Sequence, residues 1–379
     1  MVVFFLIVFS VYGLINFYIG SHGWHALPAD ASWRTTYLIA FLFLSLSFIA
    51  GRFLERLWIS PVTEALVWIG SYWLAAMLYF FLAAILVDLF RLVTSLLPVV
   101  PPDIHAAANL HRHWILVGTV GLVGLLLLVG HINAAKPRIR ELDLTIGKSL
   151  GADNTLRIVA ASDIHLGTII GRKRFDQIVG IMNSLEPDLV LFPGDIVDED
   201  LGPVIRENLG ESLRSVRARY GVFAITGNHE YIGGAEEACR YLQDHGISML
   251  RDSTATLPNG VQLVGRQDRS SRQFGGQERK PLESLMAGID HGRPIILLDH
   301  QPFHLDEAVE AQVDFQLSGH THHGQLWPLN HITNALYELS WGYLRRGSTH
   351  IYVSSGVGTW GPPVRLGNRP EILLITLRP

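Results

Sequence analysis

The chain has 379 residues, of which 49% are apolar and only 17% are charged, whereas soluble globular domains carry about 25% charged residues. Its first 130 residues contain just ten charged side chains, which excludes a single soluble domain and a disordered chain. The single cysteine, Cys239, excludes an internal disulfide framework, and a net charge of −4 gives no basic footprint for nucleic acid. The two parts of the chain are therefore expected to fold in different solvents.

Four apolar stretches in the first third predict membrane-spanning helices, over residues 2–19, 35–51, 65–88 and 114–130. A bilayer core requires about 20 helical residues. The second stretch falls furthest short, because its apolar part, Tyr37–Ala50, is brief. Four such stretches with few charges between them are nevertheless unusual in a soluble protein. We therefore expect a transmembrane domain of about four helices over residues 1–135.

The lysines and arginines around these stretches predict an orientation. With four spans, one side of the membrane carries the N-terminus, the C-terminal domain and five basic residues, which are Arg52, Arg56, Lys136, Arg138 and Arg140. The other side carries three, which are Arg34, Arg91 and Arg112. Basic residues favour the cytoplasmic side. The count predicts a multi-pass protein of the cell or inner membrane with a cytoplasmic C-terminal domain, although loss of one span would reverse this orientation.

The rest of the chain predicts an α/β domain over residues 156–379, after a linker and first strand over 136–155. Short apolar runs alternate with amphipathic segments and turn residues, as in α/β folds. The expected strands are Leu156–Ala161, Leu189–Phe192, Val222–Ile225, Val261–Val264, Ile295–Leu298, Phe315–Leu317, Ile351–Ser354 and Ile372–Leu377. The expected helices include Lys173–Leu185, Val204–Arg219, Ala235–His245 and Leu305–Ala311.

Polar clusters follow five of these strands. They contain Asp163, His165, Asp195, Asp198, Asn228, His229, His300, His320 and His322. One such residue after a strand is usually a turn former or helix cap. Five clusters together indicate a single site, because ligands of open α/β sheets bind beyond the carboxyl ends of the strands.

The residue types in these clusters indicate metal binding. Carboxylate, imidazole and amide oxygen suit Mn, Fe, Zn or Co, and the lack of nearby cysteines argues against a structural zinc site. His320 and His322 are one residue apart and would face different ways from an extended segment. This spacing favours two divalent ions side by side, which Asp195 can bridge.

The order of the five clusters resembles the calcineurin-like metallophosphoesterase superfamily, from Leu156 to the C-terminus. The sequence is also similar to its membrane-anchored branch, in which transmembrane helices precede the esterase domain, and the closing stretch Ser355–Arg365 fits that branch. The resemblance implies a β-sandwich core flanked by helices. It implies one metal held by Asp163, His165, Asp195 and His322, a second held by Asp195, Asn228, His300 and His320, and catalytic roles for His229 over the substrate and Asp198 orienting it.

The resemblance further implies a membrane-bound hydrolase of a phosphodiester, diphosphate or phosphomonoester. A hydroxide bridging the two metals would attack phosphorus, and His229 would assist the leaving oxygen. Lipid-linked substrates rank above soluble monoesters because a membrane tether raises their local concentration. Glu199 and Thr226 stand where phosphoprotein phosphatases of the superfamily have arginines, which argues against that activity. The alternative is a catalytically weak membrane sensor or scaffold, and no obligate protein partner is evident.

Three further residues or segments near the clusters carry expectations. His323 is expected to fill a turn rather than face substrate, and Asp299 could orient the ligand His300. The segment Leu336–Arg346 combines aromatic residues with a terminal basic pair, which is typical of helices at a membrane interface. Packing of this segment against the core of its own domain is the alternative.

Overall fold

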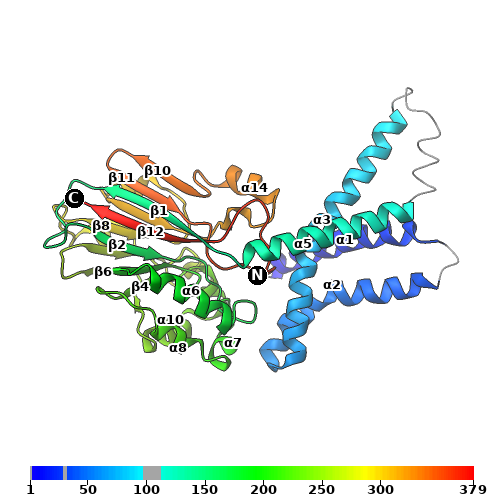
Figure 1. Cartoon of the computed structure of the whole chain (residues 1–379), viewed down its shortest axis with the longest axis horizontal. Helices are drawn as coiled ribbons and strands as arrows, with labels where there is room; N and C mark the ends of the chain where they lie inside the picture. The colour runs from blue at the N-terminus through cyan, green and yellow to red at the C-terminus, as the bar shows by residue number, and fades with distance from the viewer. Residues whose placement is uncertain (1, 29–31, 97–111) are drawn as a thin grey trace. The chain divides into compact units, whose positions relative to one another are not determined.

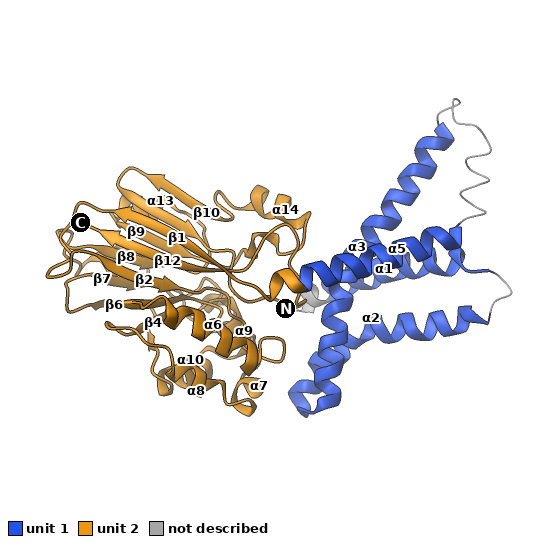
Figure 2. Ribbon diagram, viewed as in Figure 1, with its two compact units in different colours: residues 1–131 blue, residues 132–379 orange. Residues whose placement is uncertain are grey.

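The computed structural model describes residues 2–28, 32–96 and 112–379, which fall into two compact units, residues 1–131 and 132–379 (Figure 2). The described part of the first unit is helical (Figure 1). Its helices are α1 (Val2–Ala26), α2 (Trp33–Leu57), α3 (Pro61–Leu96) and α5 (Arg112–Ala134), the last of which continues into the second unit. By length and composition, all four are able to cross a membrane.

Helix α2 shows how the briefest apolar stretch becomes long enough to span. It has 25 residues, because the helix continues on both sides of Tyr37–Ala50 and ends only at Leu57. A helix of this length covers about 37 Å at 1.5 Å per residue, which exceeds the hydrocarbon core of about 30 Å. The charged pair Arg52 and Glu55, 3.4 Å apart, lies in the last two turns, where a charge can reach the membrane surface.

Small residues allow α2 and α3 to pack closely. A Cβ atom added at Gly70 would lie 2.2 Å from the backbone nitrogen of Phe48, and one added at Gly51 would lie 2.8 Å from that of Val67. Close backbone approach through small residues is the usual packing mode of membrane helices. A polar contact ties α1 to α3, because Trp73 Nε1 donates to Asn16 Oδ1 at 3.0 Å.

The second unit contains two six-stranded sheets. The first has the order β1 (Arg138–Thr145), β12 (Glu371–Arg378), β2 (Leu156–Ala160), β3 (Leu189–Pro193), β4 (Val222–Ile225) and β5 (Ser248–Met249). The second has the order β10 (Gly342–Arg346), β11 (Thr349–Val353), β9 (Phe315–Ser318), β8 (Ile295–Leu298), β7 (Gln262–Gly265) and β6 (Ser253–Thr256). Strands β2, β3 and β4 run parallel, as do β7, β8, β9 and β11, so their carboxyl ends meet at one edge of each sheet.

The main core lies between the two sheets. Apolar residues from β2, β3, β8, β9 and β12 form one buried cluster, including Ile158, Leu191, Leu298, Phe315 and Ile375. Helices cover the outer faces, because α6 (Arg172–Ser184) and α10 (Ala235–Asp244) each bury one apolar side. On the other sheet, α12 (Leu282–Met286) and α13 (Asp306–Glu310) pack in a second cluster with β7 and β8. The predicted sandwich flanked by helices is confirmed.

Two local predictions are wrong. The expected helix Val204–Arg219 is two short helices, α7 (Leu201–Arg206) and α8 (Leu209–Arg214). Asn208 separates them because its φ of 52° is left-handed, a conformation that asparagine tolerates better than most residues. The segment Leu336–Arg346 is not a helix, and its position at a membrane interface stays a prediction. Helix α14 (Leu329–Leu336) ends where this segment begins, and Gly342–Arg346 forms strand β10, antiparallel to β11.

Candidate metal centre

The carboxyl ends of five strands bring the predicted site residues together. Asp163 and His165 follow β2, Asp195 and Asp198 follow β3, Asn228 and His229 open α9 (Asn228–Gly233) after β4, His300 follows β8, and His320 and His322 follow β9. The two sheets are joined at this point, because the backbone N–H of His320 donates to Asp163 Oδ1 at 2.9 Å. The nine side chains therefore belong to one site built from both sheets.

One group of possible ligand atoms comes from Asp163, His165 and His322, which are all buried. The Nε2 atoms of His165 and His322 lie 3.0 Å apart, and His322 Nε2 lies 3.6 Å from Asp163 Oδ1. The other carboxylate oxygen of Asp163 is buried without a hydrogen-bond partner among the described residues. Burial, aided by His165 and Arg365, holds the pKa of His322 well below its usual range, so its ring is neutral and able to bind a metal.

A second group comes from Asp195, His300 and His320. His300 Nδ1 contacts the carbonyl oxygen of Pro193 at 2.8 Å. A carbonyl only accepts, so Nδ1 donates, and Nε2 faces Asp195 Oδ2 at 3.0 Å. His320 Nδ1 lies 2.7 Å from Asn228 Oδ1. Burial opposes ionisation of Asp195, but His300 and His229 hold the pKa of this carboxyl well below its usual range.

These two groups suit divalent ions. Each offers carboxylate and imidazole atoms within 4.8 Å of one another, a donor set that Mn, Fe, Zn and Co accept. Asp195 adjoins both, since its Oδ2 lies 4.0 Å from His165 Nε2 as well as beside His300. Polar atoms that are buried without hydrogen bonds are rare unless something else satisfies them, and Asp163 Oδ2 belongs to that class in the described structure.

His229 lies next to both groups, and the carboxylates around it raise the pKa of its ring. Its Nδ1 is 3.3 Å from Asp198 Oδ1 and 3.8 Å from Glu199 Oε1, and its ring centre is 4.5 Å from that of His165. Burial disfavours the charged ring, but Asp195, Asp198 and Glu199 outweigh it and raise the pKa of His229 to about 9. Asp198 is thus placed beside His229, as expected, although its role stays a prediction.

Glu230 is a structural residue of the site whose role the sequence did not reveal. Its buried carboxylate accepts four backbone N–H groups, from Asp195 (3.1 Å), Ile196 (2.7 Å), Val197 (2.9 Å) and Gly227 (2.7 Å). Burial and the nearby Asp195 raise the pKa of Glu230, and these hydrogen bonds oppose the rise. The carboxylate therefore fixes the two loops that carry Asp195 and Asn228.

Arg365 is a second residue whose contact the sequence did not reveal. It is fully buried, and its Nη2 lies 3.1 Å from His322 Nδ1. The guanidinium also donates to the carbonyl oxygens of Gly356 and Gly358 and to Asn368 Oδ1. The closing stretch Ser355–Arg365 was expected only to fit the membrane-anchored branch; in the structure it holds the ring of His322 in place.

The expectations for Asp299 and His323 have different outcomes. Asp299 does not contact His300; its carboxylate pairs with Arg266 at 3.1 Å and with Arg279 at 2.9 Å. The expectation failed because the arginines occupy the carboxylate of Asp299, while His300 Nδ1 donates to the carbonyl oxygen of Pro193 instead. His323 lies in the short 3₁₀ helix η1 (His322–Gly324) with a φ of 46°, and its Nδ1 contacts Ser340 Oγ at 3.0 Å, as expected of a turn residue.

The sandwich and its carboxylate–histidine site define an α/β protein suited to divalent metals, and similarity to known proteins narrows this class. A family model for the calcineurin-like phosphoesterase matches residues 156–324. A Danio rerio protein named "Transmembrane protein with metallophosphoesterase domain" is 33% identical over 270 residues, which cover 68% of this chain and 61% of that protein. An uncharacterized metallophosphoesterase of Helicobacter pylori is 33% identical over 248 residues, 65% of each chain.

A third relative extends over most of its own length. An uncharacterized metallophosphoesterase of Aquifex aeolicus is 30% identical over 225 residues, which cover 59% of this chain and 85% of that protein. The chain belongs to the calcineurin-like phosphoesterase family, a family of metal-dependent phosphoester hydrolases, which confirms the resemblance seen in the motifs. The four long apolar helices mark it as a membrane protein. It spans less than two thirds of the length of the first two relatives.

Glu230→Gln tests the role of the buried carboxylate. The amide keeps the shape but replaces one acceptor oxygen with an NH₂ group that faces two backbone donors, at about 1–3 kcal/mol for each donor left unpaired. We expect a clear fall in the melting temperature of the purified chain and a lower content of bound metal. Glu237→Gln removes an exposed carboxylate of α10 and should change neither. Equal behaviour of the two variants would show that Glu230 does not hold the loops.

Proposed function

We propose that the chain is a membrane-bound hydrolase of phosphoester bonds that uses two divalent metal ions. The observation that carries this proposal is the position of Asp195 between two groups of buried ligand atoms. Asp163, His165, Asp195 and His322 would hold one ion, and Asp195, Asn228, His300 and His320 the other. When bound, such a pair of ions neutralises charge on a phosphoryl group and activates water for in-line attack.

The protein groups around the ions have complementary tasks. One nitrogen of His229, Nδ1, faces Asp198 Oδ1 at 3.3 Å, and the carboxylates around the ring favour its protonated form. The other ring nitrogen is left to donate a proton to a phosphate or leaving oxygen, while Asp198 fixes the ring. Glu199 and Thr226 offer no arginine to grip the doubly charged phosphate of a monoester, so a diester or diphosphate is the favoured substrate.

Asp195→Asn and His229→Ala separate metal binding from proton transfer. Asp195→Asn should abolish hydrolysis of a soluble chromogenic phosphodiester by the metal-replete chain and lower its metal stoichiometry, because both ligand groups lose a charge. His229→Ala should keep both ions but slow turnover by about 10²–10⁴-fold, the usual effect of a lost proton donor. Turnover rates and elemental analysis measure these effects.

Asp244→Asn supplies the control for these variants, because it removes an exposed carboxylate of α10 and should leave turnover unchanged. Two ions and full turnover in Asp195→Asn would contradict the assignment of the bridging ligand. A metal-replete chain that hydrolyses no mono-, di- or lipid-linked phosphate, with or without His229, would favour the alternative of a membrane sensor or scaffold.

A lipid-linked substrate is supported by an exposed apolar rim beside the metal centre. The rim consists of Trp327, Ile332, Leu336 and Trp360, which are 53%, 55%, 66% and 56% exposed. Helix α14 has no buried residue, and the next residue, Tyr337, has its ring 6.1 Å from that of His320. The Trp360 ring lies 6.3 Å from that of His229. Exposed apolar groups gathered at one place commonly bind a membrane or an apolar ligand.

The double variant Ile332→Ser/Leu336→Ser tests the rim. We expect slower hydrolysis of a lipid phosphoester in vesicles, because the rim loses the apolar surface that would contact acyl chains. Hydrolysis of a small soluble phosphodiester should change little, because no proposed metal ligand is altered. Ile205→Ser is the matched control, since Ile205 is equally exposed on α7. Equal loss on both substrates would remove the support for a lipid-linked substrate.

We also propose that the four helices all span the membrane. The second unit, residues 132–379, here called the catalytic unit, would then be cytoplasmic, on the side with more basic residues. A reporter enzyme that is active only outside the cytoplasm should be silent when fused after Pro379. The same reporter should be active when fused after Pro28, behind α1 alone. Activity after Pro379 would mean that the number of spans is odd or that the orientation is reversed.

A further inference from the structure

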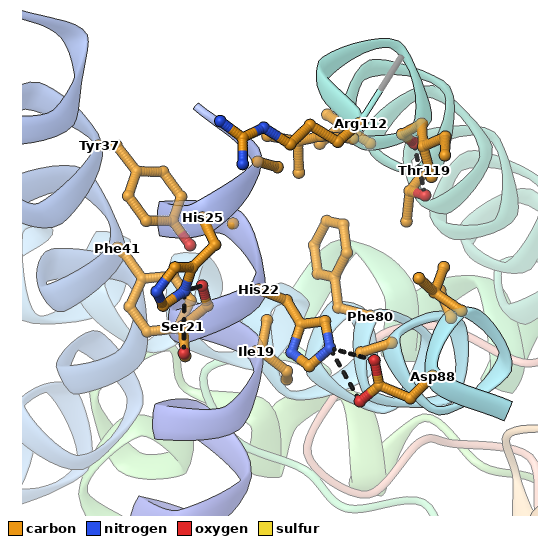
Figure 3. Close-up of a pocket in the computed structure, with 18 of the residues that line it drawn as sticks. Ile19, Ser21, His22, His25, Tyr37, Phe41, Phe80, Asp88, Arg112 and Thr119 are labelled. Carbon is orange, nitrogen blue, oxygen red and sulfur yellow. Dashed lines mark hydrogen bonds and ion pairs between the residues drawn. The ribbon is translucent and has the colours of Figure 1, made fainter. Parts of the chain in front are cut away.

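The first unit contains a cavity of about 780 Å³ between its helices (Figure 3). The wall is formed by the end of α1 (Ile19–Ala26), the start of α2 (Tyr37–Leu44), the second half of α3 (Trp73–Arg91) and the start of α5 (Arg112–Val120). Its volume lies within the usual range of sites for small molecules, about 300–1,000 Å³. Nothing in the catalytic unit contributes to this wall, so the cavity is separate from the metal centre.

The wall changes character along the helices. Wall residues far from the end of α1, the start of α2, the end of α3 and the start of α5 are mainly apolar. Among them are Leu44, Trp73, Phe80 and Val120. Nearer the ends, the wall carries His22, His25, Asp88, Arg91 and Arg112. An apolar interior with charged groups at one level is the shape expected for an amphiphile whose headgroup lies near the membrane surface.

Asp88 is already satisfied by protein groups. Tyr18 Oη donates to its Oδ2 at 2.6 Å, His22 Nε2 lies 3.0 and 3.1 Å from its two oxygens, and Arg91 Nη1 lies 3.7 Å away. Figure 3 shows the pair formed by His22 and Asp88, with Arg112 on a different wall. This carboxylate therefore has little capacity left to bind a cation in the cavity.

The basic residues of the wall are in excess. Two arginines, Arg91 and Arg112, stand against one carboxylate, Asp88, even when both histidines are neutral. Within the described ranges of the chain, no carboxylate is paired with Arg112. Arg112 is exposed at the first residue of α5, so its guanidinium is accessible to a ligand in the cavity. Basic pockets between transmembrane helices bind anionic lipid headgroups.

We propose that this cavity binds a membrane lipid with an anionic phosphate headgroup, with Arg112 as the headgroup ligand and the apolar interior around Phe80 and Trp73 as the acyl-chain site. If the helices span, α5 begins at the cavity and joins the catalytic unit at its opposite end. The bound lipid would then lie in the membrane leaflet opposite the catalytic unit. It is a second ligand rather than the substrate of the metal centre.

Lipid binding by the full chain in detergent tests this proposal. The chain carries Asp195→Asn, so that hydrolysis cannot consume the probe, and binding can fail or succeed independently of the proposed activity. The probe is fluorescent phosphatidylglycerol, displaced by unlabelled lipids of identical acyl chains. We expect phosphatidylglycerol to compete more strongly than phosphatidylcholine, by about fivefold for one arginine. Arg112→Gln should remove this preference, and Arg112→Lys should keep it.

Further variants and a soluble competitor identify the binding site and the source of the phosphate. Arg34→Gln changes a basic residue at the same ends of the helices but outside the cavity wall, and it should keep the preference. Ala83→Leu, which narrows the apolar interior, should weaken both lipids. Equal competition by the two lipids, or equal effects of Arg112→Gln and Arg34→Gln, would overturn the proposal. Displacement by glycerol phosphate at the same concentrations as the lipid would identify a soluble anion instead, and would also overturn it.

Discussion

The metal centre depends on the hydrogen bonds that the carboxylate of Glu230 accepts. This carboxylate accepts N–H groups from three residues of the loop after β3 and one of the loop after β4. A buried charge is stable only when such donors replace its water, so neither the loops nor the carboxylate would keep this arrangement alone. Since Asp195 adjoins both groups of ligand atoms, a shift of the loop after β3 would displace the whole site.

The same loops hold their ligands in costly backbone conformations. Asp163, His165, Asp195, His320 and His322 all have positive φ angles, between 45° and 72°, and each such residue costs about 1–3 kcal/mol unless its surroundings impose it. The ligands are also tightly packed, because a Cβ at Gly227 would lie 2.1 Å from Asp195 Oδ1 and one at Gly319 would lie 2.3 Å from Asp163 Oδ2. The site therefore has no room for a side chain at either glycine.

How much the sequence could predict depended on the range of each interaction. Strands such as Leu189–Phe192 were predictable because apolar periodicity is a local regularity. The five clusters were predictable because ligands of α/β sheets bind beyond the carboxyl ends of the strands. The contact of Arg365 with His322 was not predictable, because it joins residues 43 positions apart through a buried loop. The secondary structure of Leu336–Arg346 was predicted wrongly because its composition suits both an interfacial helix and a strand. Pairing with β11, a tertiary contact, favours the strand.

Helix α5 begins in the first unit and ends in the second. Its first residue, Arg112, lines the cavity, and its last turn belongs to the catalytic unit, where Asn133 Nδ2 donates to the carbonyl oxygens of Arg365 (2.9 Å) and Asn368 (2.7 Å). Arg174 binds the carbonyl oxygen of Ala134 at 2.6 Å. Asn368 in turn donates to the carbonyl oxygens of His322 and His323. The last residues of α5 are thus hydrogen-bonded, within the second unit, to the loop that fixes a proposed metal ligand.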